Sequence, residues 1–427
     1  MDNGILYWLW LQNALGQGNA KTRLVREKYG TPESLYQAGE KGWRRLGIFT
    51  EKEIERLKGY GLKAADKTAR DCERLGYTII TPENDEYPQR LLNIYNYPAV
   101  LFCKGEISFL NELLCVTIVG TRTASDYGRD TARQLARDLA GVGAAVISGG
   151  AVGIDAAAHI GALEVKGKTA AVLVCGIDTR YLVENEKLRE KISQTGLVIS
   201  EYPPGTPVNP RNFHIRNRIM SALSLGTVVV EASSRSGALI TARHAVEQGR
   251  DIFAVPGNIN DKNAGGVNKL LSDGAIPVYS AIDILKEYIT IYPHKISSVE
   301  YKNIDRAAKE KAESEAVTGR AAVPKMRDKT VAAQQILQPE SEAKPPVREN
   351  SPEFETDPPA EQIRRPLSAT VSENAKEVYK CLTREPTHVD EIIEKAKMTA
   401  PVVLASLTEL EMLNLIRSCA GRRFCAL

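Results

Sequence analysis

In the middle of the chain, the hydrophobic positions form short continuous runs and do not alternate with polar ones. Between residues 113 and 280 seven such runs occur, many rich in β-branched residues, with helical stretches between them. They are Cys115–Val119, Ala144–Ile147, Ala170–Val174, Leu197–Ile199, Thr227–Val230, Ile252–Val255 and Ile276–Val278. Strands of this kind are buried on both faces, as in a parallel sheet covered by helices. The pattern predicts a doubly wound α/β domain with its ligand crevice at the carboxyl ends of the strands.

The first hundred residues show a helical pattern instead. We predict helices at Leu6–Ala14, Ala20–Tyr29, Pro32–Ala38, Glu51–Leu57 and Leu62–Leu75. Thr31 is a favourable N-cap residue for the third helix, and Pro32 suits the first turn of that helix. Gly16-Gln17-Gly18 lies between the first two helices and is similar to the hairpin of helix-hairpin-helix modules, which present backbone amides to phosphates. The alternative is a plain turn in a small helical packing domain.

The composition changes after residue 300. Residues 301–366 hold eight of the chain's 21 prolines, one glycine and two aromatic residues, which predicts a disordered tether. Beyond it we predict three helices and a two-strand wing, the outline of a winged helix. Their ranges are 372–384, 387–396 and 399–412 for the helices, and 415–418 and 424–427 for the strands. Residues 399–407 carry no lysine or arginine, so contact with protein and contact with phosphates through Arg417, Arg422 and Arg423 both stay open.

Length and composition exclude several classes of protein. The chain has 427 residues, 43% hydrophobic and 26% charged, which suits a globular protein of two or three domains. No apolar run reaches the ~18 residues of a membrane span. The short run Ile5–Leu11 lacks a basic segment before it and predicts a buried helix, not a signal peptide. Seven cysteines without a C-x-x-C motif predict a reducing cytoplasm and neither a disulfide framework nor a zinc site.

Glycine- or hydroxyl-bearing loops follow at least five of the seven runs. The carboxyl ends of parallel strands meet at one edge of a sheet, so these loops predict a crevice lined with groups that bind phosphate. They include residues 119–128, 148–155, 231–243 and 255–258, and the stretch 265–268 opens a further helix. Tight strand-to-helix turns are the alternative reading of their glycines. The G-x-G-x-x-G fingerprint of dinucleotide sites is missing from its usual place after the first strand.

The positive charge is concentrated in one segment. The whole chain carries +3, yet residues 205–250 hold six arginines against two acids, a local charge of +4. Arg211, Arg216 and Arg218 flank Phe213, and arginines beside an aromatic ring are what single-stranded nucleic acid requires. The alternative is that Arg216 and Arg218 form internal ion pairs, with Glu231 or Asp155 as partners.

Catalytic motifs are missing from the sequence. The five histidines have no metal-ligand spacing, and neither G-x-S-x-G nor the phosphate-binding loop G-x-x-x-x-G-K-[ST] occurs. We expect the carboxylates of Asp155, Glu201 and Glu231 to orient arginines or cap helices. The sequence therefore predicts neither a metal nor a cofactor.

The order of the motifs resembles the DNA-processing protein A (DprA/Smf) family over residues 1–290, and the tail resembles that family's winged-helix appendage. The motifs are Val119-Gly120-Thr121-Arg122 with Ser125 and Tyr127-Gly128, Ser148-Gly149-Gly150-Ala151-Val152-Gly153-Ile154-Asp155, Ser200-Glu201-Tyr202-Pro203-Pro204-Gly205, Phe213 with Arg216-Asn217-Arg218, Ser236-Gly237 with Thr241-Ala242-Arg243, and Val255-Pro256-Gly257. One segment departs from the family pattern. At position 182 the chain has leucine where the family usually has proline. Some members have a lysine next to that proline, whereas this chain has Val183 and Glu184 there.

The resemblance implies a helical domain like a sterile alpha motif with a short extension (1–105), an extended Rossmann domain (106–295) and a winged helix (369–427). The disordered linker between the last two (296–368) is predicted from composition and is not a usual part of the family's core. The resemblance further implies a cytoplasmic homodimer that is not an enzyme. Such a protein binds single-stranded DNA, displaces single-strand-binding protein and loads RecA during natural transformation. The DNA-binding residues that it implies are Arg122, Ser125, Ser148, Gly149, Gly150, Gly153, Arg211, Phe213, Arg216, Asn217, Arg218, Ser236, Gly237 and Thr241. The arginines and glycine loops would hold phosphates, and Phe213 would stack on a base.

Two other functions remain open at this level. Related Rossmann-like folds act as nucleotide phosphoribohydrolases, with a glutamate at the scissile bond. Residues 236–241, in the comparable region, lack that glutamate. A structural adaptor acting through tail and tether would require the arginine-rich segment to be paired internally.

Overall fold

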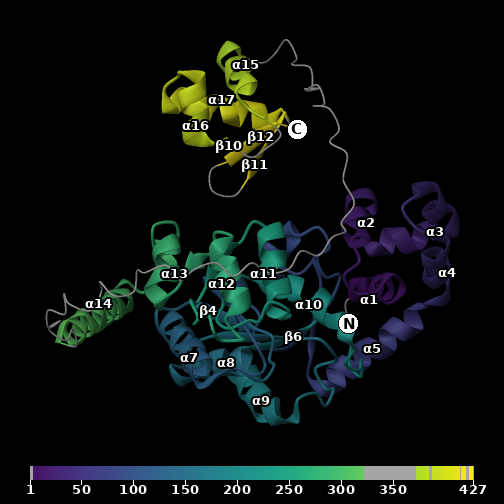
Figure 1. The fold of residues 1–427 in the computed structure, drawn as a ribbon. Helices are drawn as coiled ribbons and strands as arrows, with labels where there is room; N and C mark the ends of the chain where they lie inside the picture. The colour runs from purple at the N-terminus through teal and green to yellow at the C-terminus, as the bar shows by residue number, and fades with distance from the viewer. Residues whose placement is uncertain (1–2, 322–371, 384–386, 414, 420–422, 427) are drawn as a thin grey trace, which may run out of the picture. The chain divides into compact units, whose positions relative to one another are not determined.

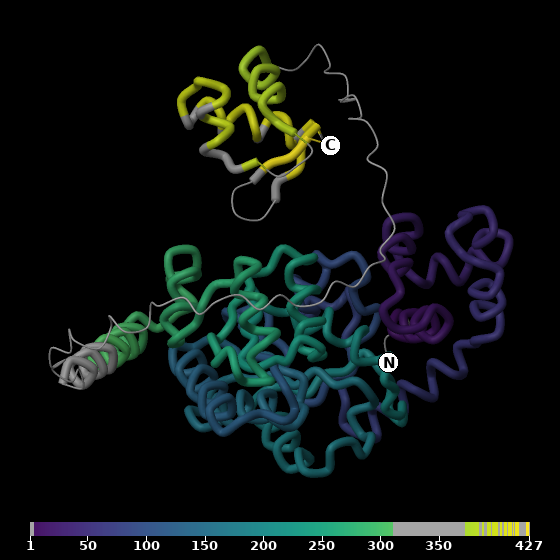
Figure 2. Tube along the Cα trace, viewed as in Figure 1, coloured from purple at the N-terminus to yellow at the C-terminus, as the bar shows by residue number. Residues whose placement is uncertain are grey.

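The computed structural model describes residues 3–321, 372–383, 387–413, 415–419 and 423–426 (Figure 1), and Figure 2 traces the path of the chain. The chain forms two compact units that divide after residue 323. The first holds the helical part and the large sheet, and the second holds the C-terminal part.

A nine-stranded sheet organises the first unit, in the order β1-β2-β6-β5-β4-β3-β7-β8-β9. All neighbours from β6 to β9 are parallel, and each of the seven predicted strands lies within one residue of its expected ends. These strands are β3 Cys115–Val119, β4 Ala145–Ser148, β5 Thr169–Leu173, β6 Leu197–Ser200, β7 Gly226–Val229, β8 Asp251–Ala254 and β9 Ile276–Pro277. The prediction of a doubly wound, mostly parallel sheet is confirmed.

Two strands that the sequence analysis did not predict extend this sheet. They are β1 Thr78–Ile80 and β2 Leu101–Gly105. β2 pairs antiparallel with β6, where Phe102 lies opposite Ser200, and β1 pairs antiparallel with β2. The sheet therefore begins before residue 106, the expected start of the Rossmann domain.

Helices cover both faces of the sheet (Figure 1). One face packs against α10 Pro210–Leu223, α11 Ala238–Glu247 and α12 Gly265–Ser272. The opposite face packs against α7 Asp126–Gly141, α8 Ile154–Glu164 and α13 Ala281–Ile289, and α9 Glu186–Thr195 packs on β5 and β6. Both cores consist mainly of small and β-branched residues, as short strands between two helical layers require.

Five helices form the N-terminal part, namely α1 Asn3–Leu15, α2 Lys21–Tyr29, α3 Pro32–Leu46, α4 Glu51–Gly59 and α5 Leu62–Leu75. Their core contains all three tryptophans, Trp8, Trp10 and Trp43. The predicted cap is confirmed, because Thr31 accepts a hydrogen bond from the Ser34 amide at 3.2 Å. α3 runs past its expected end because Gly39, at φ 59°, lets the helix kink and continue.

A further helix, α14 Ser298–Ala321, lies in the segment predicted to be a disordered linker. Tyr301, Ile304 and Ala308 share one helical face and pack against the core under α7 and α13. The remainder of the predicted linker, residues 322–368, lies outside the described residues.

The second unit contains helices α15 Glu373–Lys380, α16 Val389–Ala396 and α17 Ala400–Met412. Strands β10 Thr387–His388, β11 Ile416–Cys419 and β12 Arg423–Ala426 form an antiparallel sheet in the order β10-β12-β11. Val378, Ile392, Leu407 and Leu410 are fully or almost fully buried and make its core. The arrangement is the predicted winged helix with one additional strand, and Arg422 lies outside the described residues.

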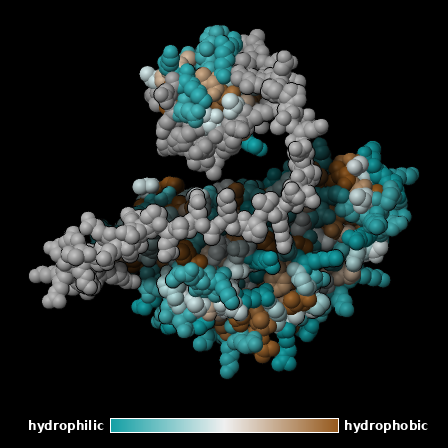
Figure 3. All heavy atoms as spheres, viewed as in Figure 1, coloured by the Kyte–Doolittle hydropathy of each residue, from teal (hydrophilic) through white to brown (hydrophobic). Residues whose placement is uncertain are grey.

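No helix within the described ranges is long and apolar enough to cross a membrane. The face drawn in Figure 3 is mainly hydrophilic where it is coloured, and its hydrophobic residues form separate small patches.

Candidate functional site

A pocket lies where the strand order of the sheet reverses. From β3 the chain continues to β4 on one side, whereas β7 occupies the other side of β3 and continues to β8. Ligands of open α/β sheets bind at such points, outside the carboxyl ends of the strands. This switch-point pocket has a volume of about 410 Å³. Its lining residues are Val119, Gly120, Thr121, Arg122, Ala151, Asp155, Phe213, His214, Arg216, Asn217, Met220, Ser236, Gly237, Ala238, Ile240 and Thr241.

Phe213 and two arginines form the most distinctive part of the pocket. The exposed Arg122 places its guanidinium carbon 4.7 Å from the centre of the Phe213 ring, and that of Arg216 lies 6.0 Å away. Tyr181 contacts the same ring at 6.4 Å between centroids. A half-buried ring with arginines over it offers both a stacking surface and positive charge.

Arg216 is anchored to the floor of the pocket. It is 5% exposed, and its Nη1 donates to the carbonyls of Gly149, at 2.8 Å, and Val172. A Cβ at position 149 would lie 2.3 Å from this Nη1, so only glycine lets the guanidinium approach. Burial lowers the pKa of Arg216, although an arginine remains protonated in a protein. Arg216 is thus a fixed positive charge behind Phe213.

Most of the predicted glycine-loop residues support the pocket from behind. Ser148 is fully buried and donates to the Ile118 carbonyl at 2.7 Å. Gly153 has φ 82°, and a Cβ there would lie 2.5 Å from the Thr121 carbonyl oxygen. Together with Gly150, at φ 67°, it lets the loops after β3 and β4 touch. The residues that line the switch-point pocket do not include Ser148, Gly149, Gly150 or Gly153. These four shape the loops behind it.

The opposite wall comes from α10 and the loop before α11. Asn217 accepts from Arg216 Nε at 3.1 Å and donates to the Gly237 carbonyl at 3.4 Å, which links the two walls. Ser236, Gly237 and Thr241 line the pocket, as the sequence analysis placed them.

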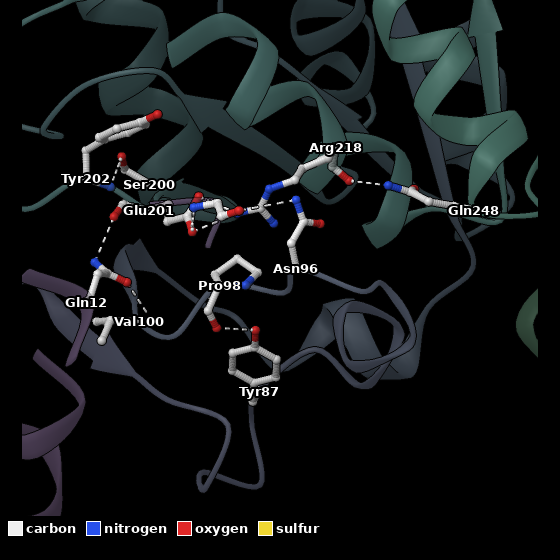
Figure 4. A network of polar contacts seen from close by, with 11 residues as sticks. Gln12, Tyr87, Asn96, Pro98, Val100, Ser200, Glu201, Tyr202, Arg218 and Gln248 are labelled. Atoms are coloured by element: carbon white, nitrogen blue, oxygen red, sulfur yellow. Dashed lines mark hydrogen bonds and ion pairs between the residues drawn. The ribbon is translucent and has the colours of Figure 1, made fainter. Parts of the chain in front are cut away.

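Arg218 lies away from the switch-point pocket. It is 3% exposed and makes a two-point ion pair with Glu201, with Nη2 at 2.7 and 2.6 Å from the carboxylate oxygens (Figure 4). The alternative of an internal ion pair therefore applies to Arg218, with Glu201 as its partner in place of Glu231 or Asp155. The helical spacing of these residues is the sequence signal that could have distinguished Arg216 from Arg218. Positions 213, 216, 217 and 220 share the face of α10 toward the pocket, whereas 211, 215 and 218 lie on another.

The Gly16–Gly18 hairpin packs against this ion pair. The Gly18 amide donates to Glu201 Oε1 at 3.0 Å, and Gln12 Nε2 donates to the Glu201 carbonyl at 3.0 Å. The amide that a helix-hairpin-helix module would offer to a phosphate is thus engaged within the protein. The hairpin serves as the turn that joins the helical part to the sheet.

Two other predicted residues also lie outside the switch-point pocket. Ser125 caps α7 by accepting from the Gly128 amide at 3.0 Å, and its hydroxyl donates to Glu231. Arg211 is exposed in the first turn of α10.

The pocket contains two titratable groups that the sequence analysis did not assign to DNA binding, Asp155 and His214. Burial raises the pKa of Asp155, against the opposing effect of Arg216. His159, by contrast, is fully buried and bonded to Thr169 at 2.7 Å, and burial lowers its pKa to about 3, so it remains neutral. Among the described residues, no group of three or more metal-ligating side chains occurs.

Comparison with known proteins identifies relatives of both units. Residues 78–289 match the family model described as DNA recombination-mediator protein A, and residues 356–422 match that of a DprA winged helix domain. The DNA processing protein DprA of Bacillus subtilis is 40% identical over 212 residues, which are 50% of this chain and 71% of that protein. Protein Smf of Synechocystis is 29% identical over 98% of both chains. A crystal structure of DprA from Streptococcus pneumoniae, 34% identical, superposes with a TM-score of 0.58 over 65% of this chain and 95% of that one.

Proposed function

The chain belongs to the DNA recombination-mediator protein A family, and we propose that it binds single-stranded DNA in the switch-point pocket. The observation that carries the proposal is the Arg122 guanidinium stacked over the half-buried Phe213 ring, at the switch point of the sheet. An aromatic ring of this kind stacks on a base only if the base is unpaired, and the arginines neutralise the adjoining phosphates. Single strands should therefore bind more tightly than duplex.

The predicted binding residues take different roles in this proposal. Arg122 and Arg216 act on phosphates, Phe213 stacks on a base, and Asn217, Ser236, Gly237 and Thr241 shape the opposite wall. Ser148, Gly149, Gly150 and Gly153 hold the loops in place, while Ser125 and Arg218 position α7 and α10. Arg211 is retained as a contact at the rim, because it is exposed.

In the cell, we propose that the protein protects incoming single strands, displaces single-strand-binding protein and loads RecA during natural transformation, acting as a homodimer in the cytoplasm. These steps follow from what the family resemblance implies. The proposed action is binding without turnover. No glutamate is among the described residues that line the switch-point pocket, and the nearby Glu231 is engaged with Ser125.

Fluorescence anisotropy of labelled oligo-dT, against a duplex of equal length, tests the proposed binding. Across a salt series, we expect tight binding of the single strand and a linear fall of log affinity with log salt, because each neutralised phosphate contributes about 0.7 to the slope. Equal affinity for the duplex, or no binding at low salt, would refute the proposal.

Asp155 should make DNA binding depend on pH. As the pH falls through the raised pKa of this carboxyl, its negative charge beside the phosphates disappears, so binding should become tighter. Asp155→Asn should bind about threefold more tightly at neutral pH, the effect of one charge roughly 6 Å away in water.

Anisotropy titrations from pH 4.5 to 7.5 check this prediction. His214 also lines the pocket, so the comparison is made in a His214→Gln background that isolates the contribution of Asp155. If Asp155→Asn retains the full pH dependence of that background, Asp155 is not its source.

A further inference from the structure

A second pocket lies at the same edge of the sheet and plays no part in the proposed DNA site. Its volume is about 440 Å³, within the range of about 300–1,000 Å³ for small-ligand sites. It is formed beyond the ends of β7 and β8, between the starts of α7 and α12. We call it the loop pocket, and its lining includes Tyr127, Val230, Glu231, Pro256, Asp261 and Val267.

The wall made by residues 256–264 is held in shape by its own side chains. Asn258 accepts from the Asn260 amide at 3.0 Å, and Asp261 accepts from the Asn263 amide at 2.8 Å. Asn263 Nδ2 in turn donates to the Thr123 carbonyl at 3.1 Å, which ties the wall to the loop after β3. The pocket is therefore preorganised, and a ligand would not have to order it.

The lining selects against phosphate and for a flat group that donates hydrogen bonds. Val230 and Val267, each 1% exposed, make an apolar floor. Asp261 supplies a carboxylate acceptor, and Glu231, whose oxygens accept from the Ser125 amide and hydroxyl, adds negative charge. Lysine and arginine are missing from the described residues that line the pocket. Tyr127, 58% exposed, offers a ring for stacking at the start of α7. Adenine, cytosine and guanine carry the exocyclic amino group that such an acceptor would bind, and thymine does not.

The loop pocket adjoins the switch-point pocket through one short loop. Arg122 lines the first and Ser125 the second, and three residues of chain span at most about 11 Å. The Thr121 amide also donates to the Glu231 carbonyl at 2.8 Å, so the two sites share a wall. The loop pocket is therefore within reach of one or two nucleotides from a phosphate held by Arg122.

We propose that the loop pocket takes one base of the same bound strand, with Tyr127 stacking on it and the carboxylates favouring an amino-bearing base over thymine. This inference rests on the proposed function, because it needs a strand in the switch-point pocket. It adds a base preference to a protein whose phosphate contacts are independent of sequence.

Anisotropy with oligo-dC and oligo-dT of equal length, at one salt concentration, tests the proposal. The full-length chain should prefer dC by about two- to tenfold, the net effect of one hydrogen bond. Tyr127→Ala should weaken binding of both strands about five- to tenfold without changing the salt slope, and Tyr127→Phe should bind like the original chain. Tyr60→Ala, which removes another exposed tyrosine at the end of α4, is the matched control and should have no effect.

Asp261→Asn tests the base preference separately. Asparagine retains an oxygen for the Asn263 amide but replaces the other carboxylate oxygen by a donor, so the dC preference should shrink toward one. If Tyr127→Ala and Asp261→Asn leave affinity and preference unchanged while Arg122→Ala weakens binding about ten- to thirtyfold, the loop pocket has no role and the proposed function survives. If the original chain binds neither strand, the proposed function itself fails.

Discussion

Glu201→Ala is expected to lower the free energy of unfolding of the first unit by about 3–5 kcal/mol, because it leaves the buried Arg218 charge without a partner. The side chains of this ion pair are 3% and 2% exposed. Arg218 Nε and Nη1 have no hydrogen-bond partner among the described residues, so Glu201 provides the compensation. The Gly18 amide would lose its acceptor as well.

Urea denaturation followed by tryptophan fluorescence measures this loss, since all three tryptophans lie in the helical part that Glu201 holds against the sheet. The double variant Glu201→Met/Arg218→Met is the decisive control. It removes both charges and retains volume, so it should recover most of the lost stability. If the double variant is as unstable as Glu201→Ala, then lost packing, and not an uncompensated charge, explains the effect.

Arg122→Ala is expected to weaken binding of oligo-dT about ten- to thirtyfold at low salt and to reduce the salt slope by about 0.7, the contribution of one phosphate contact to single-strand binding. The physical reason is that Arg122 is an exposed arginine held over a ring, so its charge is both accessible and oriented. Anisotropy titrations at several salt concentrations give both quantities.

Two further variants separate charge from stacking. Arg133→Ala removes an exposed arginine of α7 that pairs with Glu164, outside the lining of the switch-point pocket, and should leave affinity nearly unchanged. Phe213→Ala should weaken binding with an unaltered salt slope, because a stacked base carries no charge. Equal losses for Arg122→Ala and Arg133→Ala would mean that only the overall charge matters, which would contradict the assigned pocket.

The strands of the parallel sheet were predictable because their signal is local. Cys115–Val119 is a continuous apolar run with polar loops on both sides, and β3 has the same bounds. β1 and β2 were not predicted, although Ala99–Cys103 is also a continuous apolar run. β1 is three residues long, and β2 completes its pairing with β6, which lies almost a hundred residues later in the chain. Only folding brings these segments together.

The candidate site was predictable to the level of its loops, but not of its individual contacts. In the sequence, Phe213, Arg216 and Arg218 belong to a single basic segment that includes an aromatic residue. Their position on α10 divides them, since residues 213 and 216 face the switch-point pocket and 218 faces Glu201. Asp155 was visible as a carboxylate at a strand end, yet its place inside the pocket depends on how α8 packs.

The sequence by itself determined the seven strands of the parallel part of the sheet, the edge that carries their loops, and the concentration of arginines near that edge. These follow from local periodicity and from the rule that parallel strands end together. The tertiary structure alone decided which of those arginines remain available to a ligand. Burial makes an unpaired charge costly, so Arg218 became part of the framework with Glu201, while the exposed Arg122 kept its charge at the rim of the pocket.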